Sequence, residues 1–182
     1  MQTPRVRRVT VSLLIPLSTD RRQVLGVRFR TKRNGLYGIP GGGLEIDQSI
    51  FEAATAECRE ELGFEHDPKG WRIFAIRCNP ARDSNPGKPL RKYVANCPEV
   101  LQNIPVTAEH NLDMVLLSIP GFAGDVPTLV PADEDEIERI VTFDLRALPD
   151  RAVLPISDDL ELLEAYGRYV LDPTMELPIT IA

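Results

Sequence analysis

The spacing of apolar residues predicts a chain built largely from β-strands. Short apolar runs, or apolar residues alternating with polar ones, are typical of strands when turn residues bound them. In the first half of the chain, strands are expected at residues 5–16, 23–30, 36–39 and 71–78, and the polar turn 19–22 would join the first two as a hairpin. In the second half, strands are expected at residues 90–97, 112–119 and 137–143, whereas residues 99–109 fit either a loop or a short turn.

A helix is predicted between Ser49 and Gly63. Ser49 and Glu52 form the S-x-x-E pattern of a capping box, and Gly63 suits the residue that follows a helix. The side of this helix that is expected to pack on a core carries Phe51, Ala54, Cys58 and Leu62. The local signals for this element therefore agree with one another.

A second helix is predicted at residues 158–171, with Ser157 as its N-cap. Its apolar stripe consists of Leu160, Leu163, Tyr166 and Val170. Segments rich in proline, glycine and polar residues, at 79–89 and 121–131, are expected to be loops. Because the chain shows no internal repeat, we expect one α+β domain that spans residues 1–182.

The composition is that of an ordinary globular protein, with 43% hydrophobic and 26% charged residues in 182. The net charge of −6 argues against general binding to nucleic-acid polymers or to membrane surfaces. Three cysteines at irregular spacing suit a reducing compartment, and no apolar run has the length of a membrane span. We read the N-terminal apolar run as a strand and not as a signal peptide, so the cytoplasm is the expected location.

Three glutamates of the first predicted helix are expected to lie close together. Glu57, Glu60 and Glu61 stand at i, i+3 and i+4, so they fall within about 100° of arc on one face. Like charges at this spacing repel one another, and a hard divalent ion with oxygen ligands would offset the repulsion. Taken alone, the three residues fit an exposed, solvated helix face better than a metal site.

The stretch from Pro40 to Phe64 resembles the signature of the Nudix hydrolase family. That signature is a glycine, five residues, a glutamate, seven residues, and then Arg-Glu-apolar-x-Glu-Glu-x-Gly-apolar. The residues that match it are Gly42, Glu57, Cys58, Glu60, Glu61, Gly63 and Phe64. The resemblance implies an α/β/α sandwich with a mixed sheet, a catalytic loop–helix–loop and a C-terminal helix.

The resemblance also implies an activity, namely hydrolysis of the diphosphate linkage in a nucleoside diphosphate derivative. Glu57, Glu60 and Glu61 match the glutamates that bind magnesium in the family, and manganese is an alternative ion. The implied partner is a small nucleotide substrate, and a homodimer is compatible with the family.

Two positions depart from the signature. Gln48 stands where the family has its first glutamate, and Ala56 stands where it has an arginine that orients the first metal ligand. Arg59 is a candidate to replace that arginine. The departures leave a second hypothesis open, in which the chain is a catalytically weakened, nucleotide-binding sensor or regulator.

Hydrolysis also needs a group that activates water and groups that hold phosphates. In the family the base comes from the helix of the signature or from a later loop, so the candidates are Glu57, Glu61, Glu134 and Glu136. For Glu134 and Glu136 the alternative is an ordinary solvated turn. The residues expected to contact the substrate are Arg28, Arg30, Gly42, Gly43, Arg82, Lys88 and Arg91, each with plain surface charge or an ordinary turn as the alternative.

The substrate class is suggested by one residue outside the signature. ADP-ribose pyrophosphatases of the family tend to carry a proline about sixteen residues after the signature, and Pro80 lies sixteen residues after Phe64. Because this part of the chain is rich in proline, coincidence is an equal alternative. The long polar loop that follows contains Arg82 and Lys88, and such loops are often functional. We therefore expect nucleoside diphosphate sugars or ADP-ribose-like substrates to be preferred over nucleoside triphosphates. Trp71 and Tyr93 are candidates to stack a base, although Trp71 fits a core position better.

Overall fold

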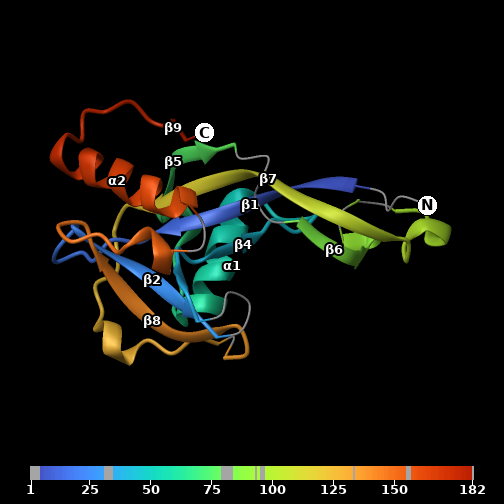
Figure 1. The fold of residues 1–182 in the computed structure, drawn as a ribbon, viewed down its shortest axis with the longest axis horizontal. Coiled ribbons are helices and arrows are strands. Elements are labelled where there is room, and N and C mark those ends of the chain that lie inside the picture. The colour runs from blue at the N-terminus through green and yellow to red at the C-terminus, as the bar shows by residue number, and fades with distance from the viewer. Residues whose placement is uncertain are drawn as a thin grey trace.

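The computed structural model of the protein describes residues 5–30, 35–78, 84–92, 94, 97–132, 134–154 and 157–181. They include two β-sheets and two α-helices (Figure 1). The larger sheet has six strands, in the order β4 (Gly41–Gly43), β1 (Arg5–Leu14), β7 (Pro105–Ser118), β5 (Trp71–Arg77) and β9 (Ile179–Ile181), with β6 (Ser84–Pro89) paired to β7. The smaller sheet has three strands, in the order β3 (Tyr37–Gly38), β2 (Gln23–Phe29) and β8 (Ile137–Asp144). Short 3-10 helices span Pro68–Gly70, Leu90–Lys92, Glu99–Leu101, Val126–Thr128 and Arg151–Val153.

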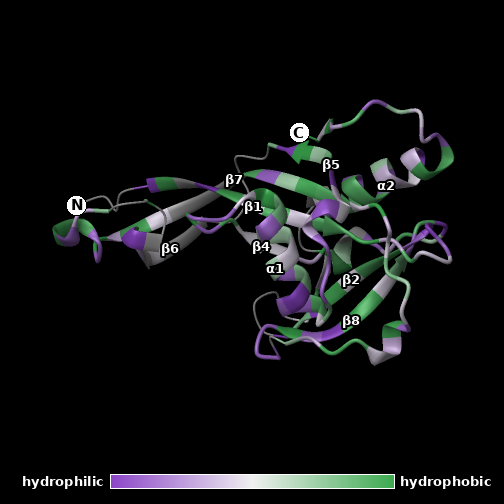
Figure 2. Ribbon diagram, turned by 180° about the vertical axis from the view of Figure 1, so that it is seen from behind, coloured by the Kyte–Doolittle hydropathy of each residue, from purple (hydrophilic) through white to green (hydrophobic). Residues whose placement is uncertain are grey.

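The larger sheet is mixed, because β1 runs parallel to β7 and β5 runs parallel to β9, while the other pairs are antiparallel. Apolar residues, green in Figure 2, occupy much of its strands in the body of the molecule. Successive side chains of a strand face opposite sides of the sheet, so on β1 Leu13 lies in one core and Leu14 in the other. Both faces of the sheet are therefore covered.

Helix α1 (Ile50–Leu62) packs in the first core. Its buried residues Ala54, Cys58 and Leu62 join apolar residues of both sheets, and Phe51 is partly buried there. Burial raises the pKa of the Cys58 thiol to about 12, so this thiol is neutral and packs as an apolar group. The predicted helix and its apolar side are confirmed.

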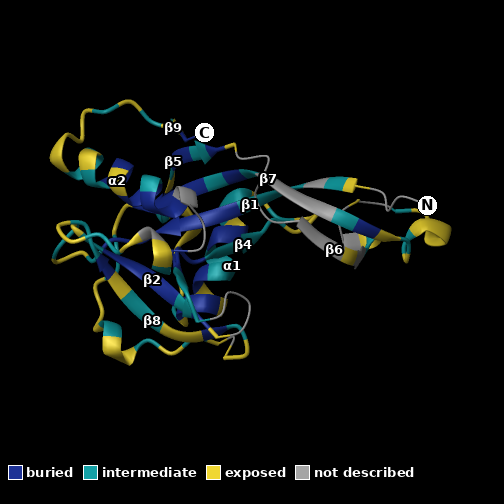
Figure 3. Cartoon of the chain, in the orientation of Figure 1, coloured by how far each residue is buried: buried dark blue, intermediate teal, exposed yellow. Residues whose placement is uncertain are grey.

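Helix α2 (Ser157–Leu171) packs in the second core. Leu160, Leu163 and Tyr166 are buried in it, and Val170 is partly buried. Tyr166 meets the ring of Phe74 edge-on, with ring centroids 5.7 Å apart. Figure 3 shows the buried residues gathered in the body of the molecule, where the sheets and the two helices meet. The expected α+β sandwich with a mixed sheet is confirmed.

The expected hairpin between the first two strands is confirmed next to the turn and wrong beyond it. The chain does reverse at residues 19–22, with the Gln23 N–H donating to the Asp20 carbonyl, but β1 and β2 belong to different sheets. Next to the turn, the residues that follow β1 pair with the start of β2 through the antiparallel bridge between Pro16 and Val24. The Leu25 N–H donates to the Ile15 carbonyl at 2.9 Å on one side of this bridge, and the Leu17 N–H donates to the Gln23 carbonyl at 2.8 Å on the other. The partner of β1 is β7, which lies about a hundred residues away, and pattern alone does not identify so distant a parallel partner.

Three further expectations are corrected in the segment before β7. Residues 84–89 form strand β6 where a loop was expected, and Leu90–Lys92 form a 3-10 turn where a strand was expected. Strand β7 begins at Pro105, seven residues earlier than predicted. Together with the outer half of β1, these elements form an arm that projects from the body (Figure 1). Pairing with the long edge of β7 outweighs the weak strand propensity of β6.

The C-terminal strand β9 was not predicted, because it has three residues. Within the described part of the chain, no helix has the length and apolar character needed to cross a membrane.

His66 is a buried histidine whose ring stacks on Trp71, with centroids 3.8 Å apart. Its Nδ1 lies 2.8 Å from the Asp67 carbonyl oxygen, and its Nε2 lies 2.8 Å from Oγ of Ser118. Because a carbonyl oxygen only accepts, Nδ1 carries the proton and Nε2 accepts from the Ser118 hydroxyl. Burial holds the pKa of His66 below its usual value, so the native ring is neutral.

We predict that the free energy of unfolding falls as the pH drops below about 6.5, because the unfolded chain protonates His66 there while the native ring resists protonation. This contribution is fully present above that pH and is lost as the pH falls toward the native pKa, at no more than about 1.4 kcal/mol per pH unit. Urea unfolding across this range should show a shallower slope for His66→Gln than for the wild type. His110→Gln is the control, and equal slopes for His66→Gln and the wild type would contradict the prediction.

Candidate active site

The helix that carries the three glutamates is fixed at both ends by local contacts. At its start the Glu52 N–H donates to Oγ of Ser49 at 3.3 Å, and the Ser49 N–H donates to Oε2 of Glu52 at 2.8 Å, which completes the predicted capping box. At its end Gly63 adopts φ 72° and donates its N–H to the Arg59 carbonyl. A Cβ on Gly63 would also overlap the carbonyl oxygen of Val130, so glycine is needed there for two reasons.

Glu61 is a buried carboxylate, with 5% of the residue exposed. Its Oε2 accepts a hydrogen bond of 2.7 Å from the N–H of Gly41, the first residue of β4. A buried carboxylate is costly unless it is hydrogen-bonded. This bond therefore ties the last turn of α1 to the glycine strand.

Glu57 lies against the next glycine of the same strand. The carboxylate of Glu57 fills the space beside the Cα of Gly42, and a Cβ on Gly42 would overlap both of its oxygens and its Cδ. The side chain of Glu57 is half-buried. Two of the three predicted ligands, Glu57 and Glu61, therefore lie against the glycines at the start of the signature. This is the arrangement expected of a loop–helix–loop site.

Glu60 is exposed, and its side chain is not among those placed against the glycine strand. Its backbone carbonyl accepts the N–H of Ala132 at 3.0 Å. The segment after Val130 is therefore attached to the end of α1.

A divalent metal fits the donors at this site in part. Carboxylate oxygens are the ligands that magnesium and manganese prefer, and the glycines leave room for Glu57 beside the strand. Among the described residues, no group of three or more histidine, cysteine or acidic side chains is gathered closely enough to hold an ion. The set of Glu57, Glu60 and Glu61 consequently stays a prediction.

The two departures from the signature have local contacts of their own. Oε1 of Gln48 accepts the Glu45 N–H at 3.4 Å, so this side chain closes the turn before the helix. Ala56 is half-buried. The replacement by Arg59 is not supported, because its guanidinium is exposed and lies 4.0 Å from Glu65.

The two later base candidates lie in the turn before β8. Glu134 is exposed and Glu136 is partly exposed. The carbonyl oxygen of Glu134 accepts from Nε of Arg30 at 2.9 Å, and that of Glu136 accepts the Arg30 N–H at 2.8 Å. Arg30 therefore anchors this turn to the end of β2 by binding two backbone carbonyls of the turn. The sequence predicted a substrate contact for Arg30 and not this structural role.

The predicted substrate residues are distributed over separate parts of the fold. Arg28 lies on β2, and Gly42 and Gly43 lie on β4. Arg91 lies on the arm, where its Nη1 donates to Oδ1 of Asn103. Lys88 is on β6, but its side chain lies outside the description, and Pro80, Arg82 and Tyr93 are outside the described residues. Arg91 is thus not gathered with the glutamates of α1.

Trp71 is a core residue. It is 6% exposed, and its Nε1 donates to Oγ1 of Thr55 at 3.1 Å, so it is not placed to stack a base.

Arg8 is a residue near the site that the pattern did not indicate. Its guanidinium occupies the space beside Gly43 that a Cβ would fill, and its Nη2 donates to Oε1 of Glu45 at 3.0 Å. Because neighbouring strand residues face opposite ways, Arg8 and Glu57 lie on opposite faces of β4. The sequence around Arg8 contains no local pattern that predicts this contact.

A buried ion cluster lies on the face of the larger sheet opposite α1, and sequence analysis missed it. Arg77 is fully buried and donates to Oδ2 of Asp113 at 2.8 Å, to Oδ1 of Asp159 at 2.7 Å and to Oγ of Ser12 at 2.6 Å. Oδ1 of Asp113 accepts from Oγ1 of Thr10 at 2.7 Å. The available signal was a charged residue next to an apolar run, Arg77 at the end of β5 and Asp113 before residues 114–117 of β7.

The same cluster reaches the glycine strand. Oδ2 of Asp159 accepts the Ile39 N–H at 3.4 Å, and the Pro40 carbonyl accepts the Leu13 N–H at 2.9 Å. Gly41, the next residue, donates to Glu61. The segment that enters β4 is therefore held by carboxylates from both helices.

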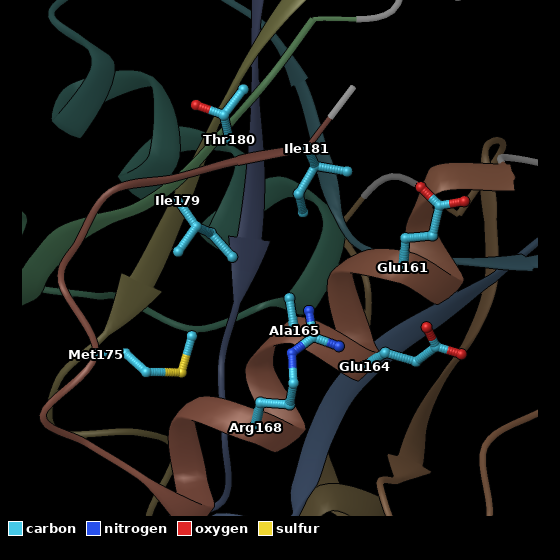
Figure 4. Close-up of a pocket in the computed structure, with 8 residues that line it drawn as sticks. All are labelled: Glu161, Glu164, Ala165, Arg168, Met175, Ile179, Thr180 and Ile181. Atoms are coloured by element: carbon cyan, nitrogen blue, oxygen red, sulfur yellow. The ribbon is translucent and has the colours of Figure 1, made fainter.

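A separate pocket of about 330 Å³ lies between α2 and the C-terminal segment (Figure 4). It is lined by Glu161, Glu164, Ala165, Arg168, Met175, Ile179, Thr180 and Ile181. None of the predicted site residues is among them. This pocket is not the site built around α1.

We predict that Gly42→Ala displaces the carboxylate of Glu57, because the added Cβ would overlap it. Manganese affinity measured by titration calorimetry should fall about tenfold or more, since one charged ligand is moved from its place. Gly167→Ala in α2 is the matched control, because a Cβ there meets no atom within 4 Å and should raise helix stability. Unchanged affinity in a folded Gly42→Ala variant would remove Glu57 from the proposed site.

Comparison with known proteins bears on the same residues. The model of the NUDIX domain family matches residues 6–160. No curated protein matches the chain.

Solved structures share its fold. A MutT/nudix family protein from Enterococcus faecalis superposes with a TM-score of 0.59 at 16% identity, over 97% of this chain and 66% of that one. A bifunctional NMN adenylyltransferase/ADP ribose pyrophosphatase from Francisella tularensis, complexed with AMP and a manganese ion, gives a TM-score of 0.62 at 17% identity, over 92% and 42%. The NUDIX domain of Shewanella oneidensis NrtR complexed with ADP ribose gives 0.59 at 14% identity, over 91% and 89%. The chain spans about two thirds of the first of these proteins and less than half of the second.

The family match covers most of the chain, including the capped helix, the two carboxylates held at the glycine strand and the residues of the signature. The chain therefore belongs to the Nudix hydrolase family, a family of pyrophosphohydrolases.

Proposed function

We propose that this protein hydrolyses the diphosphate linkage of a nucleoside diphosphate derivative with the help of a divalent metal ion. The observation that carries the proposal is the placement of Glu61 and Glu57 on successive glycines at the start of the signature. Structures that share the fold include one complexed with AMP and manganese and one complexed with ADP ribose, which supports a nucleotide ligand.

Glu57, Glu60 and Glu61 are the residues that would hold magnesium, or manganese in its place. When bound, such an ion offsets the charge on phosphate oxygens and lowers the pKa of bound water. The protein supplies the placement of the ligands. The capping box fixes the start of α1, and the bond from Gly41 fixes Glu61.

The general base would take a proton from the attacking water while the leaving phosphate departs on the other side of phosphorus. Glu61 is one candidate, although its Oε2 already accepts from Gly41. Glu134 and Glu136 are the others, and their turn is held to β2 by Arg30. Removing each carboxylate in turn and following the pH dependence of turnover would identify the base.

The second candidate function is a nucleotide-binding sensor with little or no turnover. Gln48 and Ala56 favour it, because Gln48 carries no charge and is engaged with the Glu45 N–H, and Arg59 lies against Glu65 and does not replace the missing arginine. Release of nucleoside monophosphate at enzyme concentrations far below substrate separates the two functions. Binding without turnover would favour the sensor.

We infer that residues 1–182 act as one Nudix domain. The part beyond the family match, from residue 161 of α2 to β9, shares the second core with β1, β5 and β7. The three cysteines are free thiols, which fits the reducing environment of the cytoplasm.

We predict that Glu57→Gln and Glu61→Gln each lower kcat/KM by about a hundredfold or more while leaving the fold intact, because each removes a charged ligand. Glu60→Gln should follow if Glu60 completes the set. Glu99→Gln on the arm is the control, since that glutamate is exposed and lies far along the chain from α1. Full magnesium-dependent turnover in all three variants would mean that the site is elsewhere.

We predict a preference for linked diphosphates over nucleoside triphosphates. The measurement is kcat/KM for ADP-ribose, for a nucleoside diphosphate sugar and for the common triphosphates. It is made on the wild type and on an Arg82→Ala, Lys88→Ala variant. The variant should change the ranking of substrates, because a diphosphate flanked by two sugars needs positive contacts on both sides. A triphosphate favoured tenfold, about 1.4 kcal/mol of transition-state discrimination, would overturn the preference. An unchanged ranking in the variant would do the same.

A further inference from the structure

Two arginines face each other directly across the smaller sheet. The Cα partner of Arg28 on β8 is Arg139, and its partner on β3 is Tyr37. Side chains of directly paired residues lie on the same face of a sheet, so the three form one row, Tyr37–Arg28–Arg139. Like charges directly opposite each other destabilise an antiparallel pair. The repulsion between Arg28 and Arg139 therefore lowers the stability of this strand pair.

A β-bulge next to the row supplies one counter-charge. Phe29 pairs with Ile137 while Arg28 pairs with Arg139, so Glu138 is the extra residue of β8. A bulge redirects a side chain, and Oε1 of Glu138 lies 2.9 Å from Nη1 of Arg28. Among the ion pairs of the described residues, one carboxylate, that of Glu138, thus stands against the two guanidinium groups of the row. The row therefore carries a net positive charge on a chain whose net charge is −6.

The remaining contacts hold the guanidinium groups in place without neutralising them. Nε of Arg28 donates to the Gly35 carbonyl at 2.9 Å, and its Cζ lies 5.8 Å from the centroid of the Tyr37 ring. Nη2 of Arg139 donates to the Tyr37 hydroxyl at 3.2 Å. Arg139 is exposed, and an arginine has five N–H donors, so several of them face solvent.

We propose that the row Tyr37–Arg28–Arg139 binds the phosphate group of a small ligand. Two guanidinium groups held side by side match the oxygens of a phosphate, which arginine binds in a bidentate manner. A bound phosphate would neutralise the pair that the sheet otherwise holds at a cost. The row is three residues wide, so it fits one phosphate group and not a nucleic-acid backbone.

The phosphate has two sources that share this chemistry. One source is the proposed substrate, because the row includes Tyr37 of β3, which stands four residues along the chain before Gly41 of β4. The row would then hold the far end of the proposed substrate. The other source is a separate phosphorylated ligand. Phosphate binding itself does not depend on the proposed hydrolysis.

The test uses inorganic phosphate and AMP as probes, with chelator present and ionic strength held constant with chloride. Both should raise the unfolding midpoint of the wild type in a saturable manner. Arg139→Ala should raise the dissociation constant, measured by calorimetry, by about tenfold or more. Arg139→Lys should raise it by less, because lysine keeps the positive charge but cannot bind a phosphate in the bidentate manner of a guanidinium group. Arg72→Ala is the matched control, since Arg72 is an exposed strand arginine opposite Leu117.

A second measurement, the unfolding midpoint without phosphate, separates a role of Arg139 in binding from a role in stability. Without phosphate, Arg139→Ala should unfold at the same midpoint as the wild type or a higher one, because a like-charge pair is removed. A wild type that shows no saturable binding would overturn the proposal, and so would an Arg139→Ala variant that binds as tightly as the wild type.

The source is settled by kinetics. A KM for ADP-ribose that rises in Arg139→Ala, with kcat unchanged, would assign the phosphate to the substrate, whereas an unchanged KM would assign it to a separate ligand. Glu57→Gln should keep phosphate binding at the row even though its hydrolysis is lost. Failure of the proposed activity and failure of this site are therefore distinguishable.

Discussion

The buried guanidinium of Arg77 is the interaction on which the arrangement of this fold depends. It comes from β5 and binds carboxylates of β7 and α2 and a hydroxyl of β1. Removing one partner of such a cluster typically costs about 3–5 kcal/mol, because an uncompensated charge stays buried. Apolar contacts alone would tolerate small shifts of α2 against the sheet, but directed bonds between buried charges do not. Arg77 therefore sets where α2 sits on the larger sheet.

That placement is transmitted to the active site through one short segment. Asp159 of α2 accepts from Ile39, and Glu61 of α1 accepts from Gly41, two residues later. The strand β4 is thus held from both cores, with β1 beside it. A site formed this way puts its carboxylates on rigid elements, which is what metal binding and precise placement of a phosphate require.

Sequence reasoning succeeded where the signal was local. The capping box of Ser49 and Glu52 and the left-handed Gly63 are contacts between neighbours, and they fixed α1 correctly. The spacing of Gly42, Glu57 and Glu61 indicated the family, and the structure brings these three residues together. Sequence reasoning failed where the paired strands are not adjacent in the pattern, as with the pairing of β1 to β7 and the pairing of β6 to β7 in the arm. Loop-like composition in β6 was outweighed by a partner strand that no local pattern reveals.

Residues close together along the chain specify the capped helix, the acidic residues on it and membership of the Nudix family, whereas strand β4, formed by the three glycines before the helix, was not predicted. Only the tertiary structure decided which strands pair, that Arg77, Asp113 and Asp159 share one buried cluster, and that Arg28 faces Arg139. The contacts of Arg77 and the pair of Arg28 with Arg139 join residues from 36 to more than 100 positions apart. Their formation depends on the register of the sheets and on burial, which reduces screening between charges, and neither quantity is set by the local order of residues.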